Sequence, residues 1–272
     1  SDLTGLSSTT YFRAMIQGCP TLFSNTITVT YPTVTWNGTW NPGPPTAADN
    51  VTVLSGALVL SADLSVCTFK VNNGATVTVN PGVTLTVNGV VNVAPTGALN
   101  FLDSLAFTGA ASLMQNPTTT TNANIASGTN VTYQRHIMTR KFDYTYWSSP
   151  LANTTLFNLA PSTLPDKYIK FDSNAYAWTF PNNAITMTPG IGYGIRGPQA
   201  YSPTVLTLST HSFRGVPNNG NYDNIAVFHN VPGQDLNFLG NPYPSPLSAD
   251  LFMDGNPGVL GVPGVGTTLY FW

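Results

Sequence analysis

The stretch GATVTVNPGVTLTV, residues 74–87, decides the fold, because polar and apolar residues alternate in two short runs. A period of two places successive side chains on opposite faces of a β-strand. The Asn-Pro-Gly between the runs is typical of a turn. The stretch therefore predicts two short strands joined by a tight turn.

Related phrases with a Gly-Ala start surround this stretch. They read GALVL at 56–60, GALNF at 97–101 and GAASLM at 109–114. The step of 23 residues from Gly74 to Gly97 suits one turn of a parallel β-solenoid. The other steps are shorter and less regular, which leaves a stack of antiparallel hairpins as the alternative. We favour the solenoid.

The composition of the whole chain favours strands over helices. Of the 272 residues, 7% are charged and 42% are hydrophobic, and all eleven acidic residues are Asp. Helix-favouring Glu is absent, whereas β-branched Thr and Val, which suit a pleated surface, are abundant. We predict an all-β protein in which a short β-solenoid or stacked-strand segment is followed by an antiparallel β-sandwich.

Changes in composition and periodicity along the chain predict four segments. Residues 1–31 look irregular and are interpreted as the tail of a preceding module, and residues 32–116 as the solenoid-like domain. The polar stretch 117–130 lacks periodicity and is expected to be a linker. Residues 131–272 are expected to be the sandwich, truncated at its C-terminal end. Its strand-like runs are 131–138, 142–147, 167–171, 175–180, 191–196, 204–209, 224–229 and 235–239.

Charge and hydropathy exclude several partners. A net charge of −2 with nine scattered basic residues does not make a nucleic-acid surface. No apolar run reaches the roughly 18 residues that a membrane-spanning helix needs, so we predict no membrane insertion. The first residues lack the basic and apolar regions of a secretory leader. We therefore expect a piece of a longer protein.

The two cysteines, Cys19 and Cys67, lie 48 residues apart. They form no Cys-x-x-Cys motif and have no His pair nearby, which argues against zinc. One interpretation is a disulfide, worth about 4 kcal/mol in the chain-entropy model. The other is two separate buried thiols. We predict no metal and no cofactor.

Candidate catalytic residues carry no specific pattern. Ser148, His136 and Asp143 can be drawn as a triad, but the chain has no G-x-S-x-G elbow. A polysaccharide-cleaving solenoid would need clustered carboxylates and basic residues. The predicted solenoid of this chain contains Asp63 and Asp103 but few other charged residues. We therefore predict that the chain is not an enzyme.

One aromatic run offers a contact surface for a ligand. Tyr144, Tyr146 and Trp147 follow a local cluster of basic residues at 135–141. Aromatic faces suit sugar rings, so these three are candidate glycan contacts. The alternative, which we favour, is a core strand with alternate residues buried.

Several phrases give the chain a family resemblance. The most specific are DYTYWSSP at 143–150 and GNPYPS at 240–245; others are WNGTW at 36–40, GYGIRGP at 192–198, FRGVPNNG at 213–220 and LYFW at 269–272. Over residues 33–272 the chain resembles the recurring module of large surface and secreted proteins of the Bacteroidota. These include flavobacterial adhesins and gliding-associated proteins exported by the type IX secretion system.

The resemblance implies a setting and no catalytic residues. The chain would be secreted to the outer face of a Gram-negative cell, with the type IX translocon as its partner during export. Proteins of this phylum are often O-glycosylated at Asp-Ser or Asp-Thr followed by an apolar residue, and Asp103-Ser104-Leu105 matches. Ser104 is thus a candidate modification site. The prolines of GNPYPS predict a rigid turn.

Our leading hypothesis is a non-enzymatic, extracellular structural or adhesive module of a large cell-surface protein. It would act as a stiff spacer and bind surface glycans or other cells. One alternative is a subunit that self-associates into an extracellular filament or sheath, since few charges oppose edge pairing. Another is export cargo bound to its secretion machinery. A polysaccharide-active enzyme is the least favoured.

Overall fold

The computed structural model describes residues 10–12, 15–16, 22–29, 32–116, 120–223, 225–228, 235–257 and 269–270. Strands make up most of the regular structure, in both parallel and antiparallel sheets. The helices of the described residues are short: α1 (Leu156–Leu159) and α2 (Ala249–Asp254). The predicted predominance of β-structure is confirmed.

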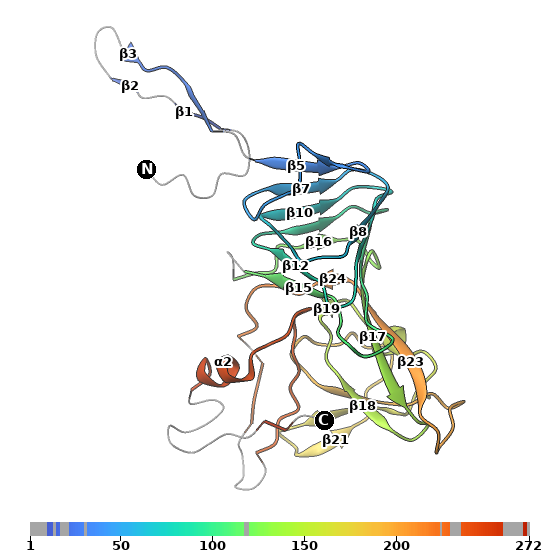
Figure 1. The fold of residues 1–272 in the computed structure, drawn as a ribbon. Coiled ribbons are helices and arrows are strands. Elements are labelled where there is room, and N and C mark those ends of the chain that lie inside the picture. The colour runs from blue at the N-terminus through green and yellow to red at the C-terminus, as the bar shows by residue number, and fades with distance from the viewer. Residues whose placement is uncertain are drawn as a thin grey trace.

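Three parallel sheets, which the chain visits in rotation, form a stack in the upper part of Figure 1. The first sheet holds β5 (Thr33–Trp36), β7 (Asn50–Val53), β10 (Thr68–Val71), β13 (Val91–Val93) and β16 (Ile125–Ala126). The second holds β8 (Ala57–Leu60), β11 (Thr76–Val79), β14 (Ala98–Phe101) and the start of β17 (Val131–Thr139). The third holds β9 (Leu64–Val66), β12 (Thr84–Val87) and β15 (Ser112–Gln115). A short strand, β6 (Trp40–Asn41), pairs antiparallel with β5.

Apolar side chains form continuous ladders inside the stack. Val51 pairs with Phe69, and Phe69 pairs with Val91 in the next coil. All three side chains are 0% exposed. Because alternate residues of a strand face opposite ways, Val and Leu occupy the inward positions of β11 and β12, and Thr occupies the outward ones. Burial of this apolar surface stabilises the stack by about 25 cal/mol per Å².

The stack continues into the segment expected to be a linker. Within 117–130, β16 pairs in parallel with β13. The next strand, β17, pairs in parallel with β14 through its first residues and antiparallel with β23 (Thr207–Arg214) along its whole length. Strand β17 therefore belongs to both parts of the molecule and connects them directly.

The second part is built from antiparallel pairs. Its four-stranded sheet has the order β18 (Tyr144–Trp147), β22 (Tyr193–Arg196), β20 (Tyr168–Asp172) and β21 (Ala177–Thr179). One face of this sheet packs on the β17–β23 ribbon through Trp147. Two-residue strands β19 (Leu151–Ala152) and β24 (Val216–Pro217) pair near the stack.

Some strand predictions in this part differ from the structure. The runs at 131–138, 142–147, 167–171, 175–180 and 191–196 each contain a strand, whereas the run at 204–209 covers only the start of β23. Residues 225–228 form no strand, and the run at 235–239 contributes one isolated bridge, between Ile191 and Leu239. These two apolar runs pack as irregular segments instead.

The N-terminal segment, expected to be irregular, contains antiparallel pairs in its described residues. β1 (Thr10–Phe12) pairs with β4 (Ile27–Val29), and β2 (Met15–Ile16) pairs with β3 (Leu22–Phe23). Figure 1 places these pairs beyond β5, at the upper end of the stack. The expectation of an irregular segment is therefore wrong for these residues.

Candidate functional site

The most specific phrases of the sequence meet where the second part joins the stack. The side-chain amide of Asn218, which is 2% exposed, donates to the carbonyl oxygens of Ser149 at 3.0 Å and Pro242 at 2.9 Å. These three residues come from the FRGVPNNG, DYTYWSSP and GNPYPS phrases. The carbonyl of Pro244 accepts from the Leu113 amide of β15 at 2.8 Å. The phrases thus build a structural junction.

A second polar cluster closes the lower end of the stack. The Asn124 amide group donates to Gln115 Oε1 at 2.7 Å and to the Pro217 carbonyl at 3.0 Å. Asn124 Oδ1 accepts from the Val91 amide at 2.9 Å and from Gln115 Nε2 at 3.0 Å. Gln115 occupies an inward position of β15 below the apolar ladder. Its side chain bonds to Asn124 and to the Gly89 carbonyl at 2.8 Å, both in the stack, and Asn124 extends the network to Pro217 of the second part.

The predicted aromatic run divides between the two faces of β18. Trp147 packs against the core, with its ring 4.9 Å from His211 and 5.7 Å from Phe213 between centroids. The core-strand interpretation therefore describes Trp147. Tyr144 and Tyr146 lie on the opposite face, because alternate residues of a strand point in opposite directions.

Tyr146 belongs to an aromatic cluster on the outer face of the four-stranded sheet. Its ring lies 6.5 Å from that of Trp178, with 10° between the planes. The Phe238 ring stands edge-on to both, at 4.9 Å from Tyr146 and 5.7 Å from Trp178. Phe171 contacts Trp178 at 5.2 Å. Trp178 remains 45% exposed, so part of this cluster is open to a ligand.

Sequence analysis missed Trp178 and Phe238, which come from distant segments. The available signal was the glycine at alternate positions of GYGIRGP, of which Gly194 pairs with Tyr146 of β18. A Cβ at Gly192 would lie 2.7 Å from the Phe238 ring, and one at Gly194 would lie 2.6 Å from Ile169 Cγ1. Both glycines thus provide space for side chains that cross the sheet.

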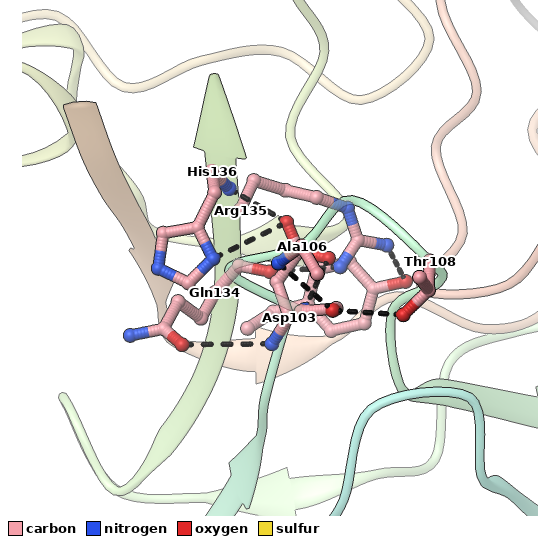
Figure 2. Close-up of polar contacts among 8 residues, drawn as sticks. Asp103, Ala106, Thr108, Gln134, Arg135 and His136 are labelled. Atoms are coloured by element: carbon pink, nitrogen blue, oxygen red, sulfur yellow. Dashed lines mark hydrogen bonds and ion pairs between the residues drawn. The ribbon is translucent and has the colours of Figure 1, made fainter. Parts of the chain in front are cut away.

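The candidate modification site, Ser104, lies on the loop between β14 and β15. Figure 2 shows the contacts of Asp103 in this loop. Asp103 anchors the loop: its carboxylate accepts from the Ser104 amide at 2.9 Å and from the His136 amide at 2.6 Å. The Ser104 hydroxyl hydrogen-bonds with Thr108 Oγ1 at 2.9 Å and accepts from the Ala106 amide at 3.2 Å. Ser104 is partly exposed. Its glycosylation stays a prediction.

Candidate catalytic residues occupy separate places. Asp63 accepts the Thr84 amide at 2.8 Å between two coils. Asp143 accepts the Arg140 amide at 2.9 Å, whereas His136 Nδ1 lies 3.7 Å from Asp103. The structure therefore does not bring His136 and Asp143 together through any hydrogen bond or ion pair of the described residues.

The described residues also lack two further features. Nowhere do three His, Cys or Asp side chains gather closely enough to hold a metal ion. No helix of this part of the chain is long and apolar enough to cross a membrane.

His211 is a buried titratable group between the two layers of the second part. Its Nδ1 donates to the Leu159 carbonyl at 3.0 Å, because a carbonyl oxygen only accepts. Its Nε2 accepts from the Ser209 hydroxyl at 3.0 Å. Burial lowers the pKa of the imidazole. Both ring nitrogens of His211 thus have hydrogen-bond partners inside the protein, which is a structural environment.

Of the two cysteines, Cys19 lies outside the described residues. Cys67 is partly buried at the turn between β9 and β10. Its amide donates to the Asp49 carbonyl at 2.8 Å, and its carbonyl accepts from the Gly89 amide at 2.7 Å. The Cys19–Cys67 disulfide stays a prediction.

Comparison with known proteins identifies a family. No curated protein and no solved structure matches the chain. A model for a domain of unknown function, DUF8693, matches residues 31–272. That range begins just before β5 and includes both the stack and the second part. The chain therefore belongs to the DUF8693 family.

Proposed function

We propose that the chain is a non-enzymatic structural and adhesive module of a large cell-surface protein, exported by the type IX system. In this interpretation the coils from β5 to β17 are a β-solenoid that serves as a stiff spacer. The β17–β23 ribbon and the four-stranded sheet are a small antiparallel sandwich that presents a contact surface. The partners are the translocon during export and then surface glycans or other cells.

The observation that carries this proposal is the uninterrupted ladder of buried side chains from one coil to the next. In the second sheet, Val77 pairs with Leu58 on one side and Leu99 on the other, and Leu99 pairs with Val131. Neighbouring coils pair through parallel strands in all three sheets. Such a stack resists bending because bending would separate close-packed side chains.

The use of carboxylates supports a non-catalytic role. Asp63 and Asp103 accept hydrogen bonds from backbone amides that connect coils or anchor a loop. A carboxylate engaged in this way stabilises the fold. Catalysis by a carboxylate pair would need both groups directed at a common bond.

Adhesion is tested with natively processed protein coupled to beads. We expect the beads to bind cells or immobilised surface glycans, and beads carrying heat-unfolded protein to bind neither. Failure of the folded protein to bind any cell or glycan surface would overturn the adhesive proposal.

Self-assembly is a second candidate, favoured by two strand edges. Among the described strands, β8 and β9 each pair on one side only, at the upper end of the stack. Unpaired edges template pairing with another chain, and a charged residue on the edge opposes it. Val59 lies on β8 and is exposed.

Light scattering over a concentration series distinguishes this candidate from adhesion. Self-assembly predicts growth in mass with concentration, reduced by Val59→Lys and unaffected by Thr78→Lys on the central strand β11. A constant monomer mass at every concentration would exclude assembly through these edges.

A further inference from the structure

A cleft of about 560 Å³ opens beside the aromatic cluster. The β20–β21 hairpin and the loop that precedes β22 form one wall. The irregular segments 221–223 and 225–228, together with Phe238 and Leu239, form the other. Its volume falls within the roughly 300–1,000 Å³ of ordinary small-molecule sites. The two apolar runs that sequence analysis expected to be strands thus line a cavity.

Four aromatic side chains line the cleft: Phe171, Tyr222, Phe228 and Phe238. Neighbours hold these rings in place. Tyr222 packs edge-on against Tyr243, with 5.7 Å between centroids, and burial raises the pKa of its phenol to about 12. Phe238 is fixed by its contacts with the cluster on the four-stranded sheet. The ligand would therefore meet preformed apolar surfaces.

The irregular wall is tied together by one side chain. Asn237 Oδ1 accepts from the Phe228 amide at 2.9 Å, and its amide group donates to the Phe228 carbonyl at 3.1 Å. This reciprocal pair joins residues 225–228 to the segment that carries Phe238. Two of the four aromatic residues are consequently held at a defined spacing without a strand.

Polar side chains accompany the rings. The cleft is lined by Asp172 and Asp223, by Lys170, and by the neutral side chain of Asn221. Asp172 accepts the amides of Asn174 and Ala175, both at 3.0 Å, which fixes its carboxylate at the end of β20. The cleft therefore combines flat apolar walls with hydrogen-bonding groups of defined position.

This combination fits a neutral sugar better than other ligands. A pyranose ring has an apolar C–H face that packs on aromatic rings, and hydroxyl groups that need directional partners. An anionic ligand would meet two carboxylates and one lysine, which is net repulsion. A wholly apolar ligand would remove these polar groups from water without replacing their hydrogen bonds.

We propose that this cleft binds a neutral oligosaccharide, with the sugar rings packed on Tyr222 and Phe238 and the hydroxyl groups bonded to Asp172, Asp223 and Asn221. The inference rests on the proposed adhesive function and assigns its glycan contact to the cleft. Tyr144, on the far strand of the sheet, and Trp147, in the core, are then outside the contact.

The test uses the whole chain with maltotriose, cellotriose and mannotriose as probes, measured by saturation-transfer NMR and by tryptophan fluorescence. We expect at least one sugar to bind. Tyr222→Ala and Asp223→Asn should each weaken that binding by about tenfold or more, a difference of about 1.4 kcal/mol. Asp223 is exposed, so its variant keeps the fold even if Tyr222→Ala does not. Tyr144→Ala is the matched control and should bind normally.

Three results would overturn the inference: no binding of any of these sugars, equal binding by the wild type and both cleft variants, or loss of binding in Tyr144→Ala alone. Preferential binding of a peptide or of a sulfated sugar would also contradict it. The bead assay distinguishes failure of the cleft assignment from failure of the proposed adhesive function. If Asp223→Asn protein adheres like the wild type, the cleft assignment fails and adhesion stands; if the wild type does not adhere, adhesion itself fails.

Discussion

The stack and the second part are made of similar short strands but are specified over different distances along the chain. In the stack, the partner of a buried residue occupies the same position one coil away, as Val77 and Leu99 do. In the second part, Tyr146 meets Trp178 and Phe238 from remote segments. Because the stack repeats, its contacts can be predicted from the local sequence pattern. The contacts of the second part join remote segments and are known only from the folded structure.

The two parts also differ in what their polar residues do. In the stack, Thr and Asn face outward, and the buried positions of the strands are almost all apolar. At the junction and in the second part, buried polar side chains such as Asn218 and His211 bond to carbonyl groups of other segments. We therefore expect the stability of the stack to fall most when buried side-chain volume is removed, and that of the second part when buried hydrogen bonds are removed.

We expect the largest loss of stability from truncating a buried side chain in the stack. Phe69→Ala removes a fully buried ring between Val51 and Val91 and should lower the free energy of unfolding by about 3–5 kcal/mol. Denaturant unfolding measures it. Phe180→Ala, at a side chain that is 70% exposed, is the control and should change stability by less than about 0.5 kcal/mol. Equal effects of the two variants would contradict the ladder.

The next effect tests the connection between the two parts. Asn124→Ala leaves Gln115 Oε1 and the Val91 amide without the partner they have in Asn124 and should cost about 1–3 kcal/mol. It should also separate the unfolding transitions seen by far-ultraviolet circular dichroism and by tryptophan fluorescence. Asn100→Ala, on the outer face of β14, is the control. A single shared transition in Asn124→Ala would show that other contacts couple the parts.

The smallest effect is a pH dependence that belongs to the second part. Because burial lowers the pKa of His211, the unfolded chain binds a proton in a range where the folded chain does not. Stability is therefore full above the unfolded pKa of about 6.5 and falls as the pH drops below it, by about 1.4 kcal/mol per unit of pKa difference. His211→Phe should flatten this slope in denaturant unfolding measured at several pH values. An unchanged slope would assign it to another group.

Part of the candidate site was predictable and part was not. The strands that carry Tyr146 and Phe171 follow the period-two pattern, and their runs were identified. Residues 225–228 and 235–239 have the same apolar character but pack as cleft walls, because the Asn237 side chain satisfies the Phe228 backbone in place of a partner strand. The alternation of polar and apolar residues does not predict a hydrogen bond between a side chain and a remote backbone. The short strand within 117–130 was not predicted for a related reason: Ile125–Ala126 is too short to show a period, yet the edge of β13 offers it a partner.

The sequence by itself determined the β-class, the short strands and the inward or outward direction of each side chain in the stack, because alternation is a property of neighbouring residues. Tertiary structure alone decided that β17 serves both parts, that three distant phrases meet at Asn218, and that Phe171, Phe238 and the irregular wall surround a cleft. Those features depend on which segments approach one another. Their approach is set by packing and hydrogen bonding summed over the whole chain, which no single stretch of residues contains.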